Sequence, residues 1–261
     1  MRGAKGVYAI LAAFVAFASV GCDHLPGKPG FRPETQTPHQ THNFAILYKT
    51  NCSACHGEQG RNGASFSLNN PVYLAWAGRD TLRNIVANGV PHRLMPAFGP
   101  SGGGLLTDKQ VDEIVDGMMG HWGQPKVLGD QAPPAYAAAM GDAAAGKAVF
   151  QTYCARCHGA DGKGLPTGGD AVNGSIVDPS YLALISSRGL RDIVVAGMPD
   201  EKMPDWRGDV PGKPMTDSEV GDVVAWLVSH RTSYPGTLIS PAQKRQKMAT
   251  HAPAKQSGSR R

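Results

Sequence analysis

The sequence predicts an all-α protein built from two tandem copies of one small helical unit. Three observations support this prediction. A five-residue pattern, Cys-x-x-Cys-His, occurs twice, the residues that follow each occurrence match one another, and apolar residues in both copies recur at helical spacing. No alternating pattern typical of strands stands out. With 261 residues, the chain is long enough for one large domain or two small ones.

The repeated pattern is the attachment signature of a c-type haem, in which two thiols bond to the porphyrin vinyl groups and the histidine binds the iron. Two other interpretations are a redox-active thiol pair and half of a zinc site. A redox pair needs no following histidine, and a zinc site would need four ligands of matching spacing within each domain. We therefore expect two covalently bound haem c groups, attached through Cys52, Cys55, Cys154 and Cys157, with His56 and His158 as proximal iron ligands.

The two copies extend over residues 42–122 and 142–232. An aromatic residue, Tyr48 or Phe150, stands four positions before the first cysteine of each pattern. Further matches are Pro71-Val72-Tyr73-Leu74 with Pro179-Ser180-Tyr181-Leu182, Leu82-Arg83 with Leu190-Arg191, Met95-Pro96 with Met203-Pro204, and Thr107-Asp108 with Thr216-Asp217. Matches that follow the same order indicate a duplicated domain.

Each copy is predicted to contain three helices. The first carries the aromatic residue and the Cys-x-x-Cys-His pattern. The second begins near Asp80 or Gly189 and ends at Gly89 or Gly197, because glycine is favoured just beyond helix C-termini. The third begins at a Thr-Asp pair, which is typical of a helix N-cap.

The first 21 residues are typical of a secretory signal peptide, because Arg2 and Lys5 precede an apolar run over residues 7–20 that is short for a membrane span. A small residue precedes Cys22, as at a bacterial lipoprotein cleavage site, although Ser19 stands where that site prefers leucine. We expect Cys22 to be the lipidated N-terminus that attaches the protein to the membrane. Ordinary cleavage nearby and an uncleaved anchor are the alternatives.

Three other segments are predicted to lie outside the repeated units. Residues 22–41 contain four prolines and are expected to form an extended tether, and residues 123–141, rich in Gly, Pro and Ala, are expected to link the domains. Residues 233–261 are predicted to be a basic, disordered tail, either simply solvated or in contact with anionic lipid or an acidic partner. Eight of the 26 bases lie in the first 22 and last 29 residues, which contain no acid. The remainder is mildly acidic, so the net charge of +5 does not indicate nucleic-acid binding.

An iron that only passes electrons needs a distal ligand, and a thioether sulfur suits that role. Met95 and Met203 are the candidates, because both precede a proline, follow the second helix and match across the repeat. Met198 also precedes a proline, but it aligns with Val90, which cannot bind iron. Packing of Met95 and Met203 within their loops, without iron, is the alternative.

Two further pairs match across the repeat. His121 and His230 lie at the ends of the third helices, where a histidine is favourable at the negative end of the helix dipole. Arg83 and Arg191 could meet haem propionates, but a position on a solvated helix face is the preferred interpretation.

With these residues considered together, each half of the chain resembles a class I cytochrome c domain. Residues 42–232 as a whole are similar to bacterial two-domain dihaem cytochromes c. The chain departs from the family pattern in the third helix, where Trp226 supplies the aromatic in the second copy but Gly117 stands at the aligned position in the first. The resemblance implies an all-α fold of two tandem class I cytochrome c domains, each a small helical fold around a covalently bound haem.

The resemblance also implies a function in single-electron transfer. The donor would be a quinol-oxidising complex or a periplasmic dehydrogenase and the acceptor a terminal oxidase, with the protein acting as a mobile carrier or as a subunit of a respiratory complex. The expected partners are therefore redox proteins, and no catalytic residue is expected. The expected location is the periplasm or the outer face of the cell membrane, with a lipid anchor at Cys22.

Other functional classes stay open at this point. A peroxidase-like dihaem enzyme or a haem-based ligand sensor needs one iron with an open position, whereas this chain offers a methionine in both copies. A thiosulfate-oxidising dihaem enzyme would be indicated by a cysteine ligand to iron. Four of the five cysteines lie in the haem motifs and the fifth is Cys22, so none remains near either haem.

Overall fold

The computed structural model describes residues 37–91, 93–137, 139–165, 174–208 and 212–233. Within these residues the regular structure is helical, apart from one isolated antiparallel bridge between Met198 and Met203, which confirms the all-α prediction. None of the described helices has the length and apolar character needed to cross a membrane. The predicted signal peptide, the lipidation candidate Cys22, the tether up to residue 36 and the tail from residue 234 lie outside the described residues.

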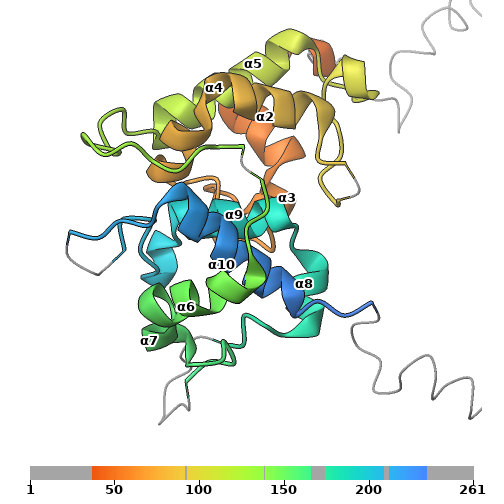
Figure 1. Ribbon diagram of the computed structural model, residues 1–261. Coiled ribbons are helices and arrows are strands. Elements are labelled where there is room, and N and C mark those ends of the chain that lie inside the picture. Colours follow the sequence, from red (N-terminus) through yellow and green to blue (C-terminus); the bar gives the residue numbers. More distant parts are fainter. Residues whose placement is uncertain (1–36, 92, 138, 166–173, 209–211, 234–261) are drawn as a thin grey trace, which may run out of the picture. The chain divides into compact units, whose positions relative to one another are not determined.

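The chain separates into an N-terminal unit that ends at Thr41 and a compact unit that begins at His42. The described part of the N-terminal unit holds one 3₁₀-helix, η1 (Pro38–Gln40). In the compact unit, the first copy of the repeat contains α2 (Phe44–Asn51), α3 (Ser53–His56), α4 (Pro71–Asn88), η2 (Pro100–Gly102) and α5 (Asp108–Trp122). The second copy contains α6 (Ala143–Tyr153), α7 (Ala155–His158), α8 (Pro179–Leu184), α9 (Ser187–Ala196), η3 (Pro199–Glu201) and α10 (Asp217–Ser229) (Figure 1).

The order of helices repeats, but their boundaries differ from the prediction in two respects. The first predicted helix is divided in two, because the backbone φ at both Cys52 and Cys154 is −118°, far from the helical value of about −63°. The second predicted helix starts earlier, at Pro71 of α4, and Gly78 breaks it with φ 73° and ψ 160°. The corresponding break in the second copy separates α8 from α9.

The third helix of each copy begins where the Thr-Asp pair predicts. The Thr107 side chain accepts a hydrogen bond from the backbone N–H of Gln110 at 3.2 Å, and the Gln110 side chain accepts one from the N–H of Thr107 at 3.0 Å. Thr216 and Glu219 make the same pair of bonds at 3.2 and 2.8 Å. Each capping box satisfies backbone donors that a helix N-terminus otherwise leaves without a partner.

The first and third helices of each copy cross where a glycine meets a large aromatic residue. In the second copy, a Cβ at Gly146 of α6 would lie 2.8 Å from the Cβ of Trp226 on α10 and 2.0 Å from the carbonyl oxygen of Asp222. In the first copy the aligned residues are Phe44 on α2 and Gly117 on α5, and a Cβ at Gly117 would lie 2.1 Å from Cδ2 of Phe44. The small and the large residue have exchanged helices between the copies, and the close crossing is kept.

This exchange gives a physical reason for the departure at Gly117. The indole that the first copy lacks at that position comes from Trp122 at the end of α5, which lies 2.8 Å from where a Cβ of Gly60 would be. In the second copy the indole of Trp226 approaches the aligned Gly162 in the same way, at 3.4 Å. Each copy therefore places a tryptophan ring against the glycine that stands four residues after the histidine of its motif, Gly60 or Gly162.

The predicted linker is anchored at residues 134–136. The indole Nε1 of Trp76 donates a hydrogen bond to the carbonyl of Pro134 at 2.6 Å, and the rings of Trp76 and Tyr136 pack with their centroids 4.8 Å apart. The guanidinium of Arg188, on α9, lies 3.3 Å from the centre of the Tyr136 ring. Aromatic burial with a satisfied indole N–H and a cation–π contact makes this part of the linker a packed element.

Arg191, which was expected on a solvated helix face, is buried instead. Its side chain is 6% exposed, donates two hydrogen bonds to the carbonyl of Ala135 at 2.6 and 3.2 Å, and pairs with Asp217. Its counterpart Arg83 is one-third exposed and pairs with two aspartates of α5 at 2.8 and 2.9 Å. The difference arises because the linker supplies Arg191 of the second copy with a carbonyl partner.

Asp192 is a partly buried carboxylate that pairs with Arg188, next to the linker contact. Its side chain is 14% exposed and accepts a hydrogen bond from Nε of Arg188 at 2.8 Å. Burial raises the pKa of Asp192 to about 6, against the opposing effect of Arg188 and Arg191. A carboxyl group whose pKa is higher in the folded state stabilises that state while it is protonated. The contribution is therefore full below the unfolded pKa of 3.8 and is lost as the pH rises through about 6.

The helix crossing predicts opposite effects for two glycines of α5. Gly117→Ala should lower the free energy of unfolding by about 1–3 kcal/mol, because the new methyl group collides with Phe44. Gly120→Ala is the matched control, since nothing lies within 4 Å of its Cβ position. It should be neutral or stabilising by about 0.5–1 kcal/mol through helix propensity. Denaturant unfolding of the haem-loaded protein measures both.

The exchange between copies predicts rescue of Gly117→Trp by Phe44→Gly. Each single change alters only one side of the crossing, whereas the pair reproduces the arrangement of the second copy. A double-mutant cycle on the same unfolding free energies should give a favourable coupling of about 0.5–3 kcal/mol. Simple addition of the two single effects would show that these residues do not fill one shared space.

Asp192→Asn should remove a pH dependence. The free energy of unfolding of the wild type minus that of the variant should fall by about 2–3 kcal/mol between about pH 4 and pH 7, since one unit of pKa shift corresponds to about 1.4 kcal/mol. Asp116→Asn is the control, because a hydrogen bond from Arg79 lowers the pKa of Asp116. For this variant, the free energy of unfolding of the wild type minus that of the variant should rise with pH instead of falling. A pH-independent difference for Asp192→Asn would contradict this assignment.

Candidate haem-binding site

The two Cys-x-x-Cys-His patterns form the same backbone turn. In each copy the histidine N–H donates to the carbonyl of the first cysteine at 3.0 Å. The N–H of the second cysteine donates to the same carbonyl, at 3.2 Å for Cys55 and 3.1 Å for Cys157. One short helix, α3 or α7, therefore carries the second thiol and the imidazole directly after the first cysteine. Covalent attachment of a haem requires these groups in this order.

A glycine directly after each histidine turns the chain away from the motif. Gly57 and Gly159 have φ values of 80° and 75°, in the region that favours glycine. A Cβ at Gly57 would lie 1.8 Å from the carbonyl oxygen of Arg61, and one at Gly159 would lie 2.4 Å from that of Gly164. Sequence reasoning did not single out these two glycines, although their matching positions after the histidines were a usable signal.

The proximal candidate His56 is held in one orientation by its own domain. Its Nδ1 lies 2.8 Å from the carbonyl oxygen of Phe66, which can only accept, so Nδ1 carries the proton and Nε2 keeps a lone pair. Burial lowers the pKa of His56, and the hydrogen bond to Phe66 acts in the opposite direction. A neutral imidazole with a fixed tautomer is the form that binds a metal, so His56 fits a haem iron.

The second proximal candidate, His158, is partly buried, and this burial lowers its pKa. Its Nδ1 has no hydrogen-bond partner among the residues that the structure describes. Phe66 stands ten residues after His56, and the position ten residues after His158, 168, lies in the segment 166–173 outside the described residues. The shared turn at α7 nevertheless presents His158 as α3 presents His56.

The cysteines of each motif differ in exposure. Cys52 is buried and Cys154 partly buried, whereas Cys55 and Cys157 are exposed. Burial, with a smaller contribution from the neighbouring thiol, raises the pKa of Cys52 and of Cys154 to about 12. A redox-active Cys-x-x-Cys pair relies on a thiol of lowered pKa, so these thiols do not match the thioredoxin-like alternative.

The two candidate distal ligands lie in similar loops. Met95 and Met203 are both partly buried, and the carbonyl of each accepts a hydrogen bond from an earlier residue of its loop. The donors are Val90, at 3.1 Å from Met95, and Met198, at 3.0 Å from Met203. Met95 also packs against the buried core that includes Cys52. Iron ligation by Met95 and Met203 stays a prediction.

A glycine at the end of the second helix fixes where each methionine loop begins. Gly89 and Gly197 have φ values of 69° and 68°, which favour glycine. A Cβ at Gly89 would lie 2.6 Å from the carbonyl carbon of Pro96, and one at Gly197 would lie 2.7 Å from that of Pro204. These residues were predicted only as helix ends, but they also set the position of the Met-Pro backbone.

The matched histidines of the third helices contact the helix crossing. The His121 ring stacks on Phe44 with centroids 5.0 Å apart, and Nδ1 of His230 lies 2.8 Å from the carbonyl oxygen of Trp226. These contacts agree with a structural role at the helix ends.

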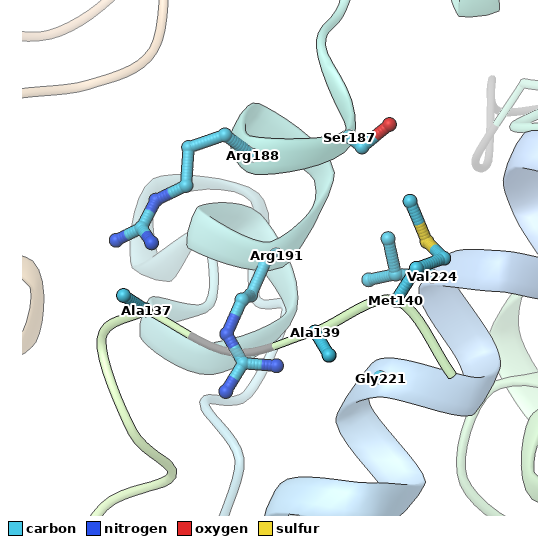
Figure 2. A pocket seen from close by; sticks show the side chains of 8 residues that line it. All are labelled: Ala137, Ala139, Met140, Ser187, Arg188, Arg191, Gly221 and Val224. Carbon is cyan, nitrogen blue, oxygen red and sulfur yellow. The ribbon is translucent and has the colours of Figure 1, made fainter.

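A groove of about 220 Å³ is lined by residues that belong to neither motif. Figure 2 shows its lining, which comes from the linker near residues 137–140 and from α9 and α10. It contains none of the cysteine, histidine or methionine candidates. The groove is therefore a feature of the linker packing and has no part in the haem-binding sites.

Comparison with a family of known proteins agrees with the two motifs. The sequence pattern of the family described as cytochrome c oxidase, cbb3-type, subunit III matches residues 39–116 and again residues 141–227. The two regions make up more than half of the chain, and each contains one Cys-x-x-Cys-His motif and one candidate methionine.

Individual relatives match parts of the chain of different length. The cbb3-type cytochrome c oxidase subunit CcoP of Azospirillum sp. (strain B510) is 32% identical over 138 residues, 48% of this chain and 42% of its own length. Subunit FixP of Sinorhizobium medicae is 32% identical over 132 residues, 46% of this chain and 39% of its own. Thiosulfate dehydrogenase of Stutzerimonas stutzeri is 28% identical over 214 residues, 77% of this chain and 66% of its own.

This chain thus spans about two fifths of the length of the first two relatives. A chain from the reducing HAO-like protein complex Kustc0457/Kustc0458 of Kuenenia stuttgartiensis aligns with a TM-score of 0.41 at 16% identity, over 77% of this chain and 99% of that one. The family match rests on the sequence pattern, which occurs in both halves and includes both motifs. Cytochrome c domains bind haem c covalently. The chain therefore belongs to the family of cbb3-type cytochrome c oxidase subunit III and is a two-domain bacterial cytochrome c.

Proposed function

We propose that this protein is a dihaem cytochrome that transfers single electrons. One haem c is attached at Cys52 and Cys55 and the other at Cys154 and Cys157, with His56, Met95, His158 and Met203 as the axial ligands. The bound haem supplies the one-electron chemistry, and ligation by methionine and histidine raises its reduction potential. The observation that carries the proposal is the identical Cys-x-x-Cys-His turn in both copies, followed in each by a glycine-anchored methionine loop.

The proposed partners follow from the relatives. CcoP and FixP are named as subunits of cbb3-type cytochrome c oxidases. We infer that this chain exchanges electrons with redox proteins of a respiratory chain, taking them from a quinol-oxidising complex or a periplasmic dehydrogenase and passing them to an acceptor such as a terminal oxidase. A fixed subunit would co-purify with a complex in stoichiometric amount, whereas a mobile carrier would not.

The proposed location is the periplasm or the outer face of the cell membrane. Covalent haem attachment and the predicted signal segment both support an extracytoplasmic site, and Cys22 is the proposed lipid anchor. The proposed domain boundaries are residues 42–122 and 142–232, joined by residues 123–141.

A thiosulfate-oxidising enzyme is the second candidate, because one relative is named thiosulfate dehydrogenase and aligns with 77% of this chain. The described cysteines all lie in the two haem motifs, so methionine is the candidate ligand in both copies. Thiosulfate added to the fully oxidised protein should therefore leave both haems oxidised. Catalytic reduction of the haems by thiosulfate would favour the enzyme instead.

The ligand assignment predicts the behaviour of two variants. Met95→Ala and Met203→Ala should each remove about half of the ferric methionine–sulfur absorption band and open one iron to carbon monoxide in the reduced state. Each should also lower the potential of one haem, because the potential-raising thioether is lost. Absorption spectra, carbon monoxide titration and redox titration of the purified holoprotein measure these effects.

Met198→Ala is the matched control for Met203→Ala. Met198 precedes a proline in the same loop, is partly buried and aligns with Val90, so its removal should leave the band and the carbon monoxide response of the wild type unchanged. An unchanged band in Met95→Ala or Met203→Ala would disprove that ligand. Carbon monoxide binding to the unaltered reduced protein would favour a peroxidase-like enzyme or a ligand sensor with one open iron.

A further inference from the structure

Asn70 is one of three buried polar residues among those that the structure describes, and it is 1% exposed. It lies at the N-terminus of α4, in the first copy. Its Oδ1 accepts a hydrogen bond from the N–H of Tyr73 at 3.1 Å and thereby caps α4. This bond uses only the oxygen of the amide. The amide nitrogen is available for a second contact, and it makes that contact in the other copy of the repeat.

The Nδ2 of Asn70 donates to two carbonyls at the end of α9, those of Ala196 at 3.2 Å and Gly197 at 3.1 Å. Carbonyls in the last turn of a helix have no partner within the helix, so an external donor is stabilising there. Because the group is buried, removal of the donor would leave carbonyls without a partner and without water. The contact therefore ties the start of α4 to the end of α9.

The end of α9 is also the beginning of the loop that carries Met203. Gly197 lies so close to this loop that a Cβ on it would be 2.7 Å from the carbonyl oxygen of Met203. The next residue, Met198, is joined to Met203 by two backbone hydrogen bonds, at 3.0 and 3.1 Å. A displacement of the Gly197 carbonyl is therefore transmitted to the backbone of Met203 through direct contacts.

A second contact joins the same two regions at the surface. Arg61, in the loop after the first haem motif, lies 3.5 Å from Asp200 in η3. Both side chains are more than one-third exposed, and exposed ion pairs of this kind contribute little. The buried amide of Asn70 is therefore the contact with the greater influence on the Met203 loop.

The arrangement is not reciprocal. Asp178 occupies the position in the second copy that aligns with Asn70, and it caps α8 by accepting hydrogen bonds from Ser180 and Tyr181. An ionised carboxylate can only accept, so Asp178 cannot donate to the helix end that precedes Met95. The first copy thus supports the methionine loop of the second copy through a side-chain donor that the second copy does not return.

We propose that Asn70 of the first domain is a positioning residue for Met203, so that methionine ligation of the second haem depends on contact with the first domain, whereas ligation of the first haem by Met95 does not depend on Asn70. This inference rests on the proposed function, because it takes Met203 as an iron ligand. It makes the two haems inequivalent although their motifs are the same.

The test uses Asn70→Asp in two backgrounds that each retain one methionine. In the Met95→Ala holoprotein, the ferric methionine–sulfur band reports Met203 alone, and in Met203→Ala it reports Met95 alone. Asn70→Asp keeps the oxygen that caps α4 but replaces the donor with a carboxylate that repels two carbonyls. The pH at which the band is lost should fall by about one unit in the Met95→Ala background, a tenfold weakening of ligation equal to about 1.4 kcal/mol. It should not move in the Met203→Ala background.

Asn69→Asp is the matched control. It introduces the same charge one residue away and removes only a donation to the carbonyl of Gln59 within the first copy. The pH at which the Met203 band is lost should therefore be the same as with wild-type Asn69. If Asn70→Asp does not fold, Asn70→Ser takes its place in the test. Asn70→Ser keeps a capping oxygen and adds no charge, and it should likewise lower the pH at which the Met203 band is lost.

The possible outcomes separate the two claims. Equal shifts in both backgrounds, or no shift with the band present, would overturn the positioning role and leave the proposed ligands intact. Absence of any methionine–sulfur band in Met95→Ala with wild-type Asn70 would overturn Met203 as a ligand, and the positioning role with it. A measurement of the second haem's reduction potential should follow the same pattern, falling in Asn70→Asp and not in Asn69→Asp.

Discussion

The close crossing between the first and third helices of each copy is the contact on which the haem-binding turn depends. Cys52 and Cys154 follow directly after α2 and α6, so the direction of each cysteine is set by how that helix packs on α5 or α10. A glycine at the crossing lets the backbones approach, and an aromatic side chain fills the opposite side. The copies place the glycine on different helices, which indicates that the helix separation is the constraint and that the identity of either residue is not.

The two domains share this helix crossing, but different contacts hold their motifs and loops in place. In the first domain, His56 donates a hydrogen bond to the carbonyl of Phe66, and ion pairs at the surface join Arg83 of α4 to two aspartates of α5. The second is held from outside, by the linker carbonyl bound to Arg191 and by the amide of Asn70 at the end of α9. A duplicated sequence has thus produced two candidate haem sites that are held by different contacts.

Much of this organisation was accessible from the sequence, because it is expressed in local patterns. The two motifs, the duplication, the all-α class and the starts of the third helices each depend on spacing over a few residues, and the structure or the family match confirms them. The axial ligands, the lipidation of Cys22 and the domain boundaries stay predictions. The early start of α4 was missed because its first turns precede the break at Gly78 and do not continue the apolar spacing of the later ones.

The remaining features depend on contacts between residues far apart in the chain. Arg191 was wrongly placed on a solvated face, because nothing near it in the sequence shows that the linker would cover it. The second contact of Asn70 joins residues 126 and 127 positions apart, which no local pattern can indicate. The exchange of Phe44 and Gly117 for Gly146 and Trp226 was visible only as an isolated departure at Gly117, since its compensation lies on another helix.

The central claim is that each half of this chain carries one covalently attached haem. It is tested most directly by haem counting on the protein produced in a host that attaches haem c, using a pyridine-haemochrome assay together with the intact mass of the denatured chain. The account predicts two haems per chain that resist acid–acetone extraction, and one haem when Cys154 and Cys157 are both replaced by alanine. A single haem in the unaltered chain, or haem that is extracted by acid–acetone, would contradict it.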